Sequence, residues 1–129
     1  MLLDTMVLIW HLMGSDRLSK KAKAIIQQGG NFYSPVSLWE LAIKNRIGRV
    51  SLSIDGQPVS ARTLIVTVVN RLQLNLLNLT FEDFASVESL ETYHQDPFDH
   101  LLITQSKRNN LPIVSSDSIF DRYEMHRVW

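Results

Sequence analysis

Short apolar runs alternate along the chain with longer segments in which apolar residues recur every three or four positions. Runs of the first kind predict buried strands, and the second spacing predicts helices with one buried face. We expect strands at residues 1–3, 32–34, 74–79, 112–115 and 125–129. We expect helices at residues 4–13, 19–28, 37–47, 61–72, 80–90 and 97–109, with a short helical turn at 118–123. Residues 49–60 contain Gly56 and Pro58, which predict a turn or short hairpin.

The alternation of strands and helices predicts the fold class. Strands that are separated by long helices are joined by parallel crossovers. We therefore expect an α/β fold, a three-layer α/β/α sandwich with a central parallel sheet. The chain has 129 residues, of which 45% are hydrophobic, and this suits one domain over residues 1–129 with a substantial core.

Composition narrows the possible functions. The 13 lysine and arginine residues balance 13 aspartate and glutamate residues, so a nucleic acid would have to be held by a local basic patch. The absence of cysteine excludes disulfides, thiolate nucleophiles and cysteine-based metal sites. Neither a basic leader nor a long apolar segment follows Met1, so we expect a soluble protein of the cytoplasm without a membrane span.

Four acidic residues lie near the points where strand-like runs give way to helices. They are Asp4, Glu40, Asp99 and Asp117. In a parallel α/β sheet the carboxyl ends of the strands share one edge, and ligands bind there. We therefore expect these carboxylates to converge, although they are far apart in sequence. Clustered acids repel one another and are tolerated where a cation such as Mg²⁺ or Mn²⁺ neutralises them, which favours metal-dependent phosphate chemistry.

Helix capping offers another explanation for the same acids. Residues 37–40, Ser-Leu-Trp-Glu, match a capping box. Residues 96–99, Asp-Pro-Phe-Asp, match an acidic N-cap followed by proline and a first-turn acid. Asp117 is placed to cap a short helix, and Asp83 lies in another cap-like sequence, so the pattern alone does not separate Asp83 from Asp99. A first-turn acid contributes about 0.3 to 1 kcal/mol through the helix dipole.

Basic residues near Glu40 have both a functional and a structural interpretation. Lys44, Arg46 and Arg49 follow Glu40 and are candidates for gripping substrate phosphates. Lys44 also stands four residues after Glu40, the spacing of an ordinary ion pair on a solvated helix face. The sequence leaves both interpretations open.

Histidine and tryptophan residues are expected to have structural roles. His94 and His100 flank Asp96, but their spacing matches no recognised pattern of metal ligands, so we expect partly exposed loop histidines. Trp10 and Trp39 are expected to pack in the core.

Four stretches of the chain, in order, carry a family resemblance. They are Leu-Leu-Asp-Thr with Leu-Ile-Trp (residues 2–5 and 8–10), Ser-Leu-Trp-Glu-Leu-Ala-Ile-Lys (37–44), His-Gln-Asp-Pro-Phe-Asp with Leu-Leu-Ile (94–99 and 101–103), and Val-Ser-Ser-Asp with Phe (114–117 and 120). Over essentially its whole length the chain resembles the PIN-domain nucleases. More narrowly, it resembles the VapC-like toxin ribonucleases of type II toxin-antitoxin systems.

The resemblance implies a metal-dependent endoribonuclease that is the toxin of a toxin-antitoxin pair. Its catalytic, metal-binding acids would be Asp4, Glu40, Asp99 and Asp117, with Asp96 as a fifth acid nearby and Mg²⁺ or Mn²⁺ as the cofactor. Three hydroxyl residues would support the site, namely Thr5, Ser37 and Ser115. RNA would be the substrate, an antitoxin protein the partner, and a homodimer the assembly. Nothing in the family pattern corresponds to Asp83.

The chain departs from the family pattern at several positions. Met6 stands where histidine is frequent, His100 replaces a frequent arginine, and Ser106 replaces a common alanine. None of these changes removes an acid, but the change at position 100 removes one expected phosphate or structural contact. For the antitoxin or a second copy, the candidate surface is a groove or dimer face that includes the apolar segment at residues 54–72, with Leu64, Ile65, Val66, Val68 and Val69. The sequence leaves open that Val66 to Val69 belong to the core instead.

Functions from other classes fit the residues less well. A catalytically inactive PIN-fold binding or scaffold module would use the acids as caps, and the complete set of four argues against it. A flavodoxin-like phosphoacceptor would need paired acids at the end of the first strand. A haloacid-type phosphatase would need a second aspartate two residues after Asp4, where Met6 stands.

Overall fold

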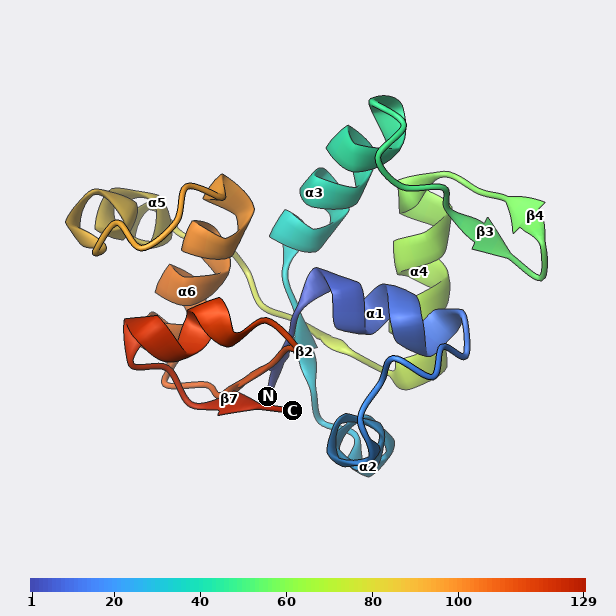
Figure 1. The fold of residues 1–129 in the computed structure, drawn as a ribbon, viewed down its shortest axis with the longest axis horizontal. Helices are drawn as coiled ribbons and strands as arrows, with labels where there is room; N and C mark the ends of the chain where they lie inside the picture. Colours follow the sequence, from blue (N-terminus) through green and yellow to red (C-terminus); the bar gives the residue numbers. More distant parts are fainter.

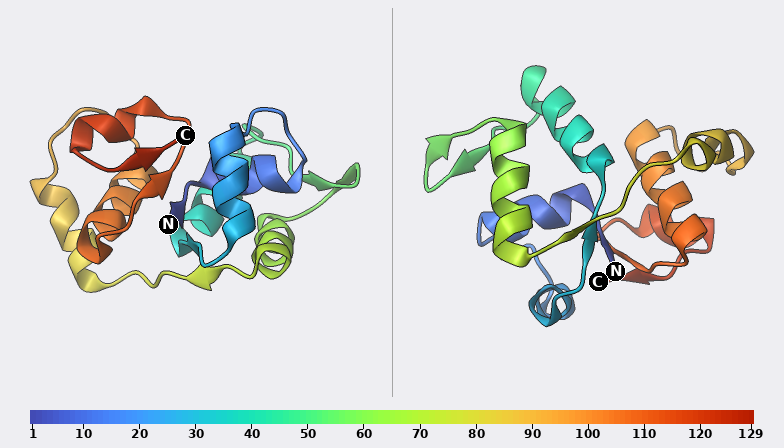
Figure 2. Two further views of the ribbon diagram at one scale, coloured as in Figure 1. Left: turned by 90° about the horizontal axis from the view of Figure 1, so that it is seen from below. Right: turned by 180° about the vertical axis from the view of Figure 1, so that it is seen from behind.

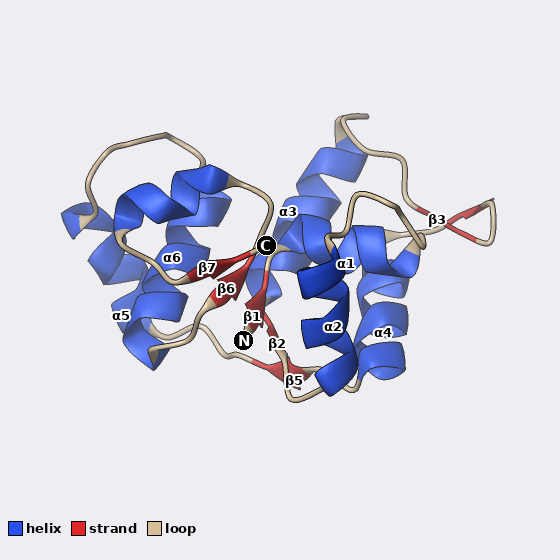
Figure 3. Ribbon diagram, turned by 60° about the horizontal axis from the view of Figure 1, so that its bottom comes forward, coloured by secondary structure: helices blue, strands red, loops and turns tan.

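A computed structural model describes all residues from 1 to 129. Its central sheet has five strands in the order β5-β2-β1-β6-β7, and every neighbouring pair is parallel. The strands are β1 (Leu2–Leu3), β2 (Phe32–Tyr33), β5 (Asn75–Leu76), β6 (Ile113–Val114) and β7 (Arg127–Val128). The prediction of a parallel sheet is confirmed (Figure 3). The hydrogen-bonded strands are shorter than the apolar runs that contain them.

Six α-helices and two 3-10 helices flank these strands. They are α1 (Thr5–Leu12), α2 (Lys20–Gln28), α3 (Pro35–Arg46), α4 (Ala61–Leu72), α5 (Phe81–Ala85), η1 (Ser86–Ser89), α6 (Pro97–Asn109) and η2 (Ser118–Tyr123). The helix predicted at residues 80–90 is divided into α5 and η1, where Ser89 Oγ donates to the Ser86 carbonyl at 2.9 Å and competes with α-helical pairing. No helix has both the length and the apolar character needed to cross a membrane.

Each face of the sheet has its own core, because neighbouring residues of a strand point to opposite sides. Leu3 and Val114 face the larger core, which includes residues of α1, α2 and α4. Leu2 and Ile113 face the smaller core, which includes Phe120 of η2 and residues of α6. Figure 2 shows the two groups of helices on either side of the strands. The structure is therefore the three-layer α/β/α sandwich predicted from the sequence.

The segment after α3 forms the short hairpin that the sequence predicts. It consists of β3 (Ser53–Ile54) and β4 (Gln57–Pro58), which are antiparallel. The turn between them is Asp55-Gly56, and both residues have positive φ, 51° and 76°, as a tight two-residue hairpin turn requires. Figure 1 shows the hairpin projecting from the body of the molecule beside α4.

Helix α4 does not offer the apolar partner surface expected from the sequence. It packs against α1 and α3, and Leu64, Ile65 and Val68 are at most 4% exposed within the larger core. The expected groove for an antitoxin or a second copy is therefore wrong for these side chains, because the core needs them. Val66, by contrast, is 49% exposed.

Candidate active site

The register of the sheet brings the end of the chain beside its beginning. Leu3 of β1 aligns with Val114 of β6, so the next residues, Asp4 and Ser115, lie side by side at the carboxyl edge of the sheet. Ser115 Oγ donates a hydrogen bond to Asp4 Oδ2 at 2.6 Å. The Asp4 carboxylate, at the junction of β1 and α1, is therefore held in place by Ser115, which follows the neighbouring strand β6.

Asp4 is not used as a helix cap. It occupies the N-cap position of α1, yet its side chain makes no capping hydrogen bond, and the residue is 7% exposed. Burial raises the pKa of the Asp4 carboxyl to about 6; the hydrogen bond from Ser115 opposes this rise, and the negative charge of Glu40 adds to it. A capping role does not explain why this acid is retained inside the molecule.

Glu40 lies deeper in its helix than the sequence suggests. Ser34 is the N-cap of α3 and accepts a hydrogen bond from Val36 N, and Pro35 is the first helical residue. The predicted capping box formed by Ser37 and Glu40 is therefore wrong, because the helix has already begun before Ser37.

The Glu40 side chain is buried and only partly satisfied. Its side chain is 6% exposed, and Oε1 pairs with Lys44. The interpretation of this pair as an ion pair on a solvated face is wrong, because the glutamate end is buried. Glu40 Oε2 is buried without a hydrogen-bond partner. Such an oxygen is costly in a folded protein unless something else binds it.

Two of the predicted supporting hydroxyls link the helices that carry the acids. Thr5 Oγ1, at the start of α1, donates to Ser37 Oγ of α3 at 3.0 Å, and both residues are fully buried. This bond fixes the first turn of α3 against the end of β1. It thereby holds Glu40 on the same side of the sheet edge as Asp4.

Asp96 and Asp99 have different roles at the start of α6. Asp96 is the N-cap, and its Oδ1 accepts hydrogen bonds from Phe98 N at 2.9 Å and Asp99 N at 3.5 Å, as predicted. Asp99 is left without a capping role, and its Oδ2 lies 3.1 Å from His94 Nε2. Its side chain is 19% exposed.

Asp99 is the acid whose pKa is raised by all the other acids assigned to the site. Burial raises the pKa of its carboxyl to about 8, together with the negative charges of Asp4, Asp96, Glu40 and Asp117. Every acid that the sequence assigns to the site thus acts on this one carboxyl group. The convergence expected from the strand ends is present in the electrostatics of the folded chain.

Asp117 is the most accessible of the assigned acids. It is exposed and caps η2, because its Oδ1 accepts a hydrogen bond from Ile119 N at 2.8 Å. Its own backbone N–H donates to Ser115 Oγ at 3.1 Å. Ser115 therefore joins Asp4 and Asp117, and the predicted cap and the predicted site residue are the same side chain.

The acids are not already arranged as a coordination sphere. No group of three acidic or histidine side chains is placed to hold one metal ion, because Asp4, Glu40 and Asp99 each face a separate partner. The donor set nevertheless fits a divalent cation. It consists of carboxylate oxygens, it is destabilised by its own repulsion, and it includes the unpartnered Glu40 Oε2. A hard cation such as Mg²⁺ or Mn²⁺ would relieve each of these costs.

Asp83 has a wholly different environment. It completes a capping box with Thr80, whose backbone N–H donates to Asp83 Oδ2 at 2.7 Å. Arg108 of α6 adds hydrogen bonds at 2.7 and 3.0 Å. Burial opposes ionisation of this carboxyl, but the bonds from Arg108 and Thr80 outweigh it and hold the pKa of Asp83 below its ordinary value. The prediction of a capping acid is confirmed here.

The basic residues predicted to bind substrate lie along and beyond α3. Lys44 faces Glu40, while Arg46 and Arg49 are exposed where the helix ends. The structure does not bring Arg46 or Arg49 into a hydrogen bond or ion pair with the acids. Their role in binding phosphates stays a prediction.

Trp39 corrects one expectation about the aromatic residues. It is 48% exposed, so its assignment to the core is wrong, and it packs edge to face against Phe98 at 4.7 Å between ring centroids. Trp39 immediately precedes Glu40, and Phe98 immediately precedes Asp99. An aromatic pair, of which Trp39 is exposed and Phe98 is partly buried, therefore immediately precedes two acids of the site in sequence. Trp10, in contrast, packs against the larger core as predicted.

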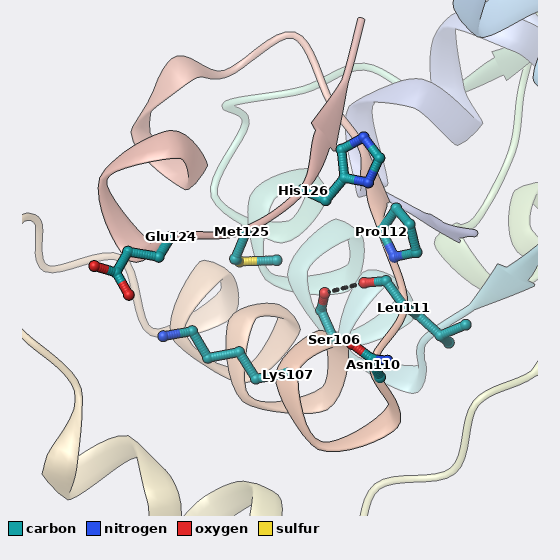
Figure 4. A pocket seen from close by; sticks show the side chains of 8 residues that line it. All are labelled: Ser106, Lys107, Asn110, Leu111, Pro112, Glu124, Met125 and His126. Carbon is teal, nitrogen blue, oxygen red and sulfur yellow. Dashed lines mark hydrogen bonds between the residues drawn. The ribbon is translucent and has the colours of Figure 1, made fainter.

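A cavity lies at the other edge of the sheet, where β6 and β7 begin. It has a volume of about 330 Å³ and is lined by residues at the end of α6 and in the segments entering β6 and β7, among them Lys107, Asn110 and His126 (Figure 4). It contains none of the assigned acids. Because ligands of parallel sheets bind at the carboxyl edge, this cavity is not a competing candidate for the active site.

Comparison with known proteins identifies the fold. The model of the PIN domain family matches residues 1–125. Similar solved structures include VapBC2 from Rickettsia felis bound to a DNA fragment from its promoter (TM-score 0.67, 12% identity, 98% of this chain and 96% of that chain). FitAcB from Neisseria gonorrhoeae (0.65, 14%, 99% and 96%) and a toxin-antitoxin complex from Klebsiella pneumoniae (0.64, 12%, 99% and 95%) are also similar. No curated protein sequence matches significantly.

The two kinds of match carry different weight. At identities this low, the solved structures establish a common fold and no more. The family match covers nearly the whole sequence and includes all of the acids at the sheet edge. The chain belongs to the PIN domain family.

Proposed function

We propose that this chain is a metal-dependent endoribonuclease and the toxin of a toxin-antitoxin pair. The observation that carries the proposal is the state of Asp99. It is a half-buried carboxyl without a capping role, and burial together with the charges of four other acids raises its pKa to about 8. An acid so destabilised costs the protein stability, and cation binding gives a reason to retain it.

In the proposed site, Asp4, Glu40, Asp99 and Asp117 hold Mg²⁺ or Mn²⁺, with Asp96 adding negative charge beside them. A divalent ion bound there supplies activation of a water for attack on phosphorus and stabilisation of the leaving oxygen. Ser115 orients Asp4, and the Thr5–Ser37 bond keeps the start of α3 in place. The products expected from this chemistry carry a 5′-phosphate and a 3′-hydroxyl.

RNA is the proposed substrate, and the surface beside the acids supports a single-stranded form. Trp39 and Phe98 present an aromatic surface next to Glu40 and Asp99. Stacking of a base on such a surface contributes about 1 to 3 kcal/mol and needs an unpaired base. Lys44, Arg46 and Arg49 are proposed to contact the phosphates that flank the cleaved bond, since the chain has no net positive charge to hold RNA.

An antitoxin protein and a second copy of the chain are the proposed partners. The antitoxin proposal is supported by the solved structures of the same fold, which include toxin-antitoxin complexes. The homodimer remains a proposal from the family resemblance alone. If the toxin role is correct, expression of the chain by itself slows growth, and co-expression of the antitoxin restores it.

The decisive experiment is cleavage of RNA by the purified protein. We expect cleavage in Mg²⁺ or Mn²⁺, none in EDTA, and none with Asp99→Asn. Glu82→Gln is the matched control, because Glu82 is an exposed acid in the first turn of α5. Folded parent protein that cleaves neither RNA nor DNA in either metal would favour the inactive PIN-fold scaffold instead.

A further inference from the structure

His94 connects the acids to a group of packed histidine and tyrosine rings. It lies in the loop before α6, and its side chain is 18% exposed. One ring nitrogen, Nε2, lies 3.1 Å from Asp99 Oδ2. The other, Nδ1, lies 3.0 Å from the hydroxyl of Tyr123, which belongs to η2 and is 2% exposed. Both nitrogens of this histidine are therefore engaged, one by the site and one by the protein interior.

The direction of these hydrogen bonds follows from the group at their far end. His100 Nε2 lies 3.1 Å from the His94 carbonyl oxygen, which can only accept, so this nitrogen carries a hydrogen. The same N–H lies 3.4 Å from the Tyr123 hydroxyl oxygen and donates weakly to it. The hydroxyl hydrogen of Tyr123 is then free to point at His94 Nδ1.

An acceptor at Nδ1 determines the form of His94. A neutral imidazole that accepts at Nδ1 carries its hydrogen on Nε2. When Asp99 is ionised, as a metal ligand must be, that hydrogen donates to Asp99 Oδ2. The donors then run in one direction, from His100 through Tyr123 and His94 to the Asp99 carboxylate.

The packing of the rings restricts the alternatives. The rings of His94 and His100 meet edge to face at 4.8 Å between centroids, and those of Tyr93 and Tyr123 at 5.0 Å. Arg122 lies over the outer face of this group, 4.3 Å from the Tyr93 ring centroid. Rotation of His94 about its side-chain bonds would break both of its hydrogen bonds and disturb these contacts. The histidine is thus fixed in orientation by residues of α6 and η2.

We propose that His94 is a positioning residue, which fixes one oxygen of the Asp99 carboxylate through a directed chain of donors that begins at His100 and passes through Tyr123. The inference rests on the proposed function, because it assigns Asp99 to the metal. Held at Oδ2, the carboxylate presents its other oxygen toward the remaining acids. His94 itself binds neither substrate nor metal in this assignment.

Disruption of this chain of hydrogen bonds should weaken metal binding more than RNA binding. The outer partners of metal-binding groups typically affect affinity about 10- to 100-fold. We expect His94→Ala to reduce Mn²⁺ affinity by roughly this factor, with a lower kcat and an unchanged KM for RNA. His94→Gln retains an N–H donor in the place of Nε2–H and should recover most of the loss.

Tyr123→Phe tests the directed chain itself. It removes only the hydroxyl and retains the ring packing, so we expect a smaller loss of Mn²⁺ affinity in the same direction. Tyr93→Phe is the matched control, because the Tyr93 hydroxyl has no hydrogen bond to the site and its ring is a neighbour in the same group. Mn²⁺ binding is measured by electron paramagnetic resonance of the free ion, beside thermal unfolding in EDTA.

A spectroscopic measurement gives a second, independent test. Nitrogen-15 NMR of the histidine rings distinguishes the two neutral forms. We expect His94 to carry its hydrogen on Nε2 in the Mg²⁺ complex of the parent, and Tyr123→Phe to shift the Nδ1 resonance. A hydrogen on Nδ1 of His94 in the Mg²⁺ complex would overturn the directed chain.

Failure of this inference can be told apart from failure of the proposed function. If the parent binds Mn²⁺ and cleaves RNA while His94→Ala and Tyr123→Phe lower only the melting temperature, His94 is merely structural and the nuclease proposal stands. If the parent binds Mn²⁺ but cleaves no RNA, the positioning of Asp99 stands and the ribonuclease proposal fails. If the parent binds no Mn²⁺, both are overturned.

Discussion

Asp83 and Asp99 occupy the same position in two helices that pack against each other, α5 and α6. Each is the third residue after its N-cap, Thr80 in one case and Asp96 in the other. The pKa of Asp83 is lowered, because the hydrogen bonds from Arg108 and Thr80 outweigh its burial. The pKa of Asp99 is raised to about 8 by burial and by neighbouring negative charges. Acids at equivalent positions of the two helices thus have pKa values that are shifted in opposite directions.

The N-cap residue accounts for much of this difference. Thr80 leaves its own backbone N–H to be satisfied, and Asp83 reaches back to it. Asp96 accepts hydrogen bonds from Phe98 N and Asp99 N and is itself an acid, so Asp99 meets a negative charge and does not reach back to the Asp96 backbone N–H. The acid at the third position of α6 is therefore not part of a capping box.

The largest expected effect is the loss of activity in Asp99→Asn. A neutral amide binds Mg²⁺ far less well than a carboxylate, so RNA cleavage should fall to background. Stability in EDTA should change little, because a dipole contribution of about 0.3 to 1 kcal/mol is lost while repulsion among the acids is relieved. Cleavage assays and thermal unfolding in EDTA measure the two effects. Full activity in Asp99→Asn would show that Asp99 does not belong to the catalytic site.

Asp83→Asn should show the reverse behaviour. Its carboxylate is inaccessible and serves Thr80 and Arg108, so the substitution should cost about 1 to 3 kcal/mol of unfolding free energy rather than a dipole contribution alone. Activity per folded molecule should be unchanged well below the melting temperature. Urea unfolding and cleavage at low temperature test both statements. A loss of activity without a loss of stability would show that Asp83 belongs to the site.

The pH dependence of stability in EDTA should separate the two acids further. A carboxyl group with a raised pKa binds more protons folded than unfolded, so Asp99 lowers the unfolding free energy as pH rises from about 4 to about 8. Asp4 acts in the same direction up to about pH 6. Unfolding series at several pH values should show this slope, and Mg²⁺ or the Asp99→Asn substitution should reduce it. An equal slope in Asp99→Asn would assign the effect to other groups.

The smallest expected effect is that of Asp96→Asn. Asparagine is about as good an N-cap as aspartate, so the cap of α6 should survive with a stability change of less than about 1 kcal/mol. The substitution removes one of the charges that raise the pKa of Asp99, so that pKa should fall. Carbon-13 NMR of the Asp99 carboxyl in EDTA would detect the fall. An unchanged Asp99 pKa would mean that burial and the other acids sustain it without Asp96.

The sequence predicted the sheet and the positions of most helices, because these depend on local periodicity. Asp4 follows β1, as a general property of parallel sheets led us to expect, but Glu40 lies inside α3, and Asp99 follows a loop after η1 rather than a strand. It misplaced the start of α3 at Ser37. Ser34 and Pro35, a favourable N-cap and first residue, were the local signal for the earlier start.

Tertiary contacts account for the remaining differences. The exposure of Trp39 and the burial of Leu64 depend on how closely neighbouring helices pack, and α3 is apolar on several faces. The contact between His94 and Tyr123 joins residues 29 positions apart in sequence. No local sequence pattern predicts such a contact, so from the sequence His94 was expected to be an ordinary loop residue.

The bond between Ser115 and Asp4 joins residues 111 positions apart in sequence. During synthesis, β1 leaves the ribosome before β6 and cannot pair with it until the residues between them have also emerged. Until then, a growing chain carries Asp4 without Ser115 or Asp117 beside it. Assembly of the acid site waits for β6, and a chain stopped before β6 lacks part of that site.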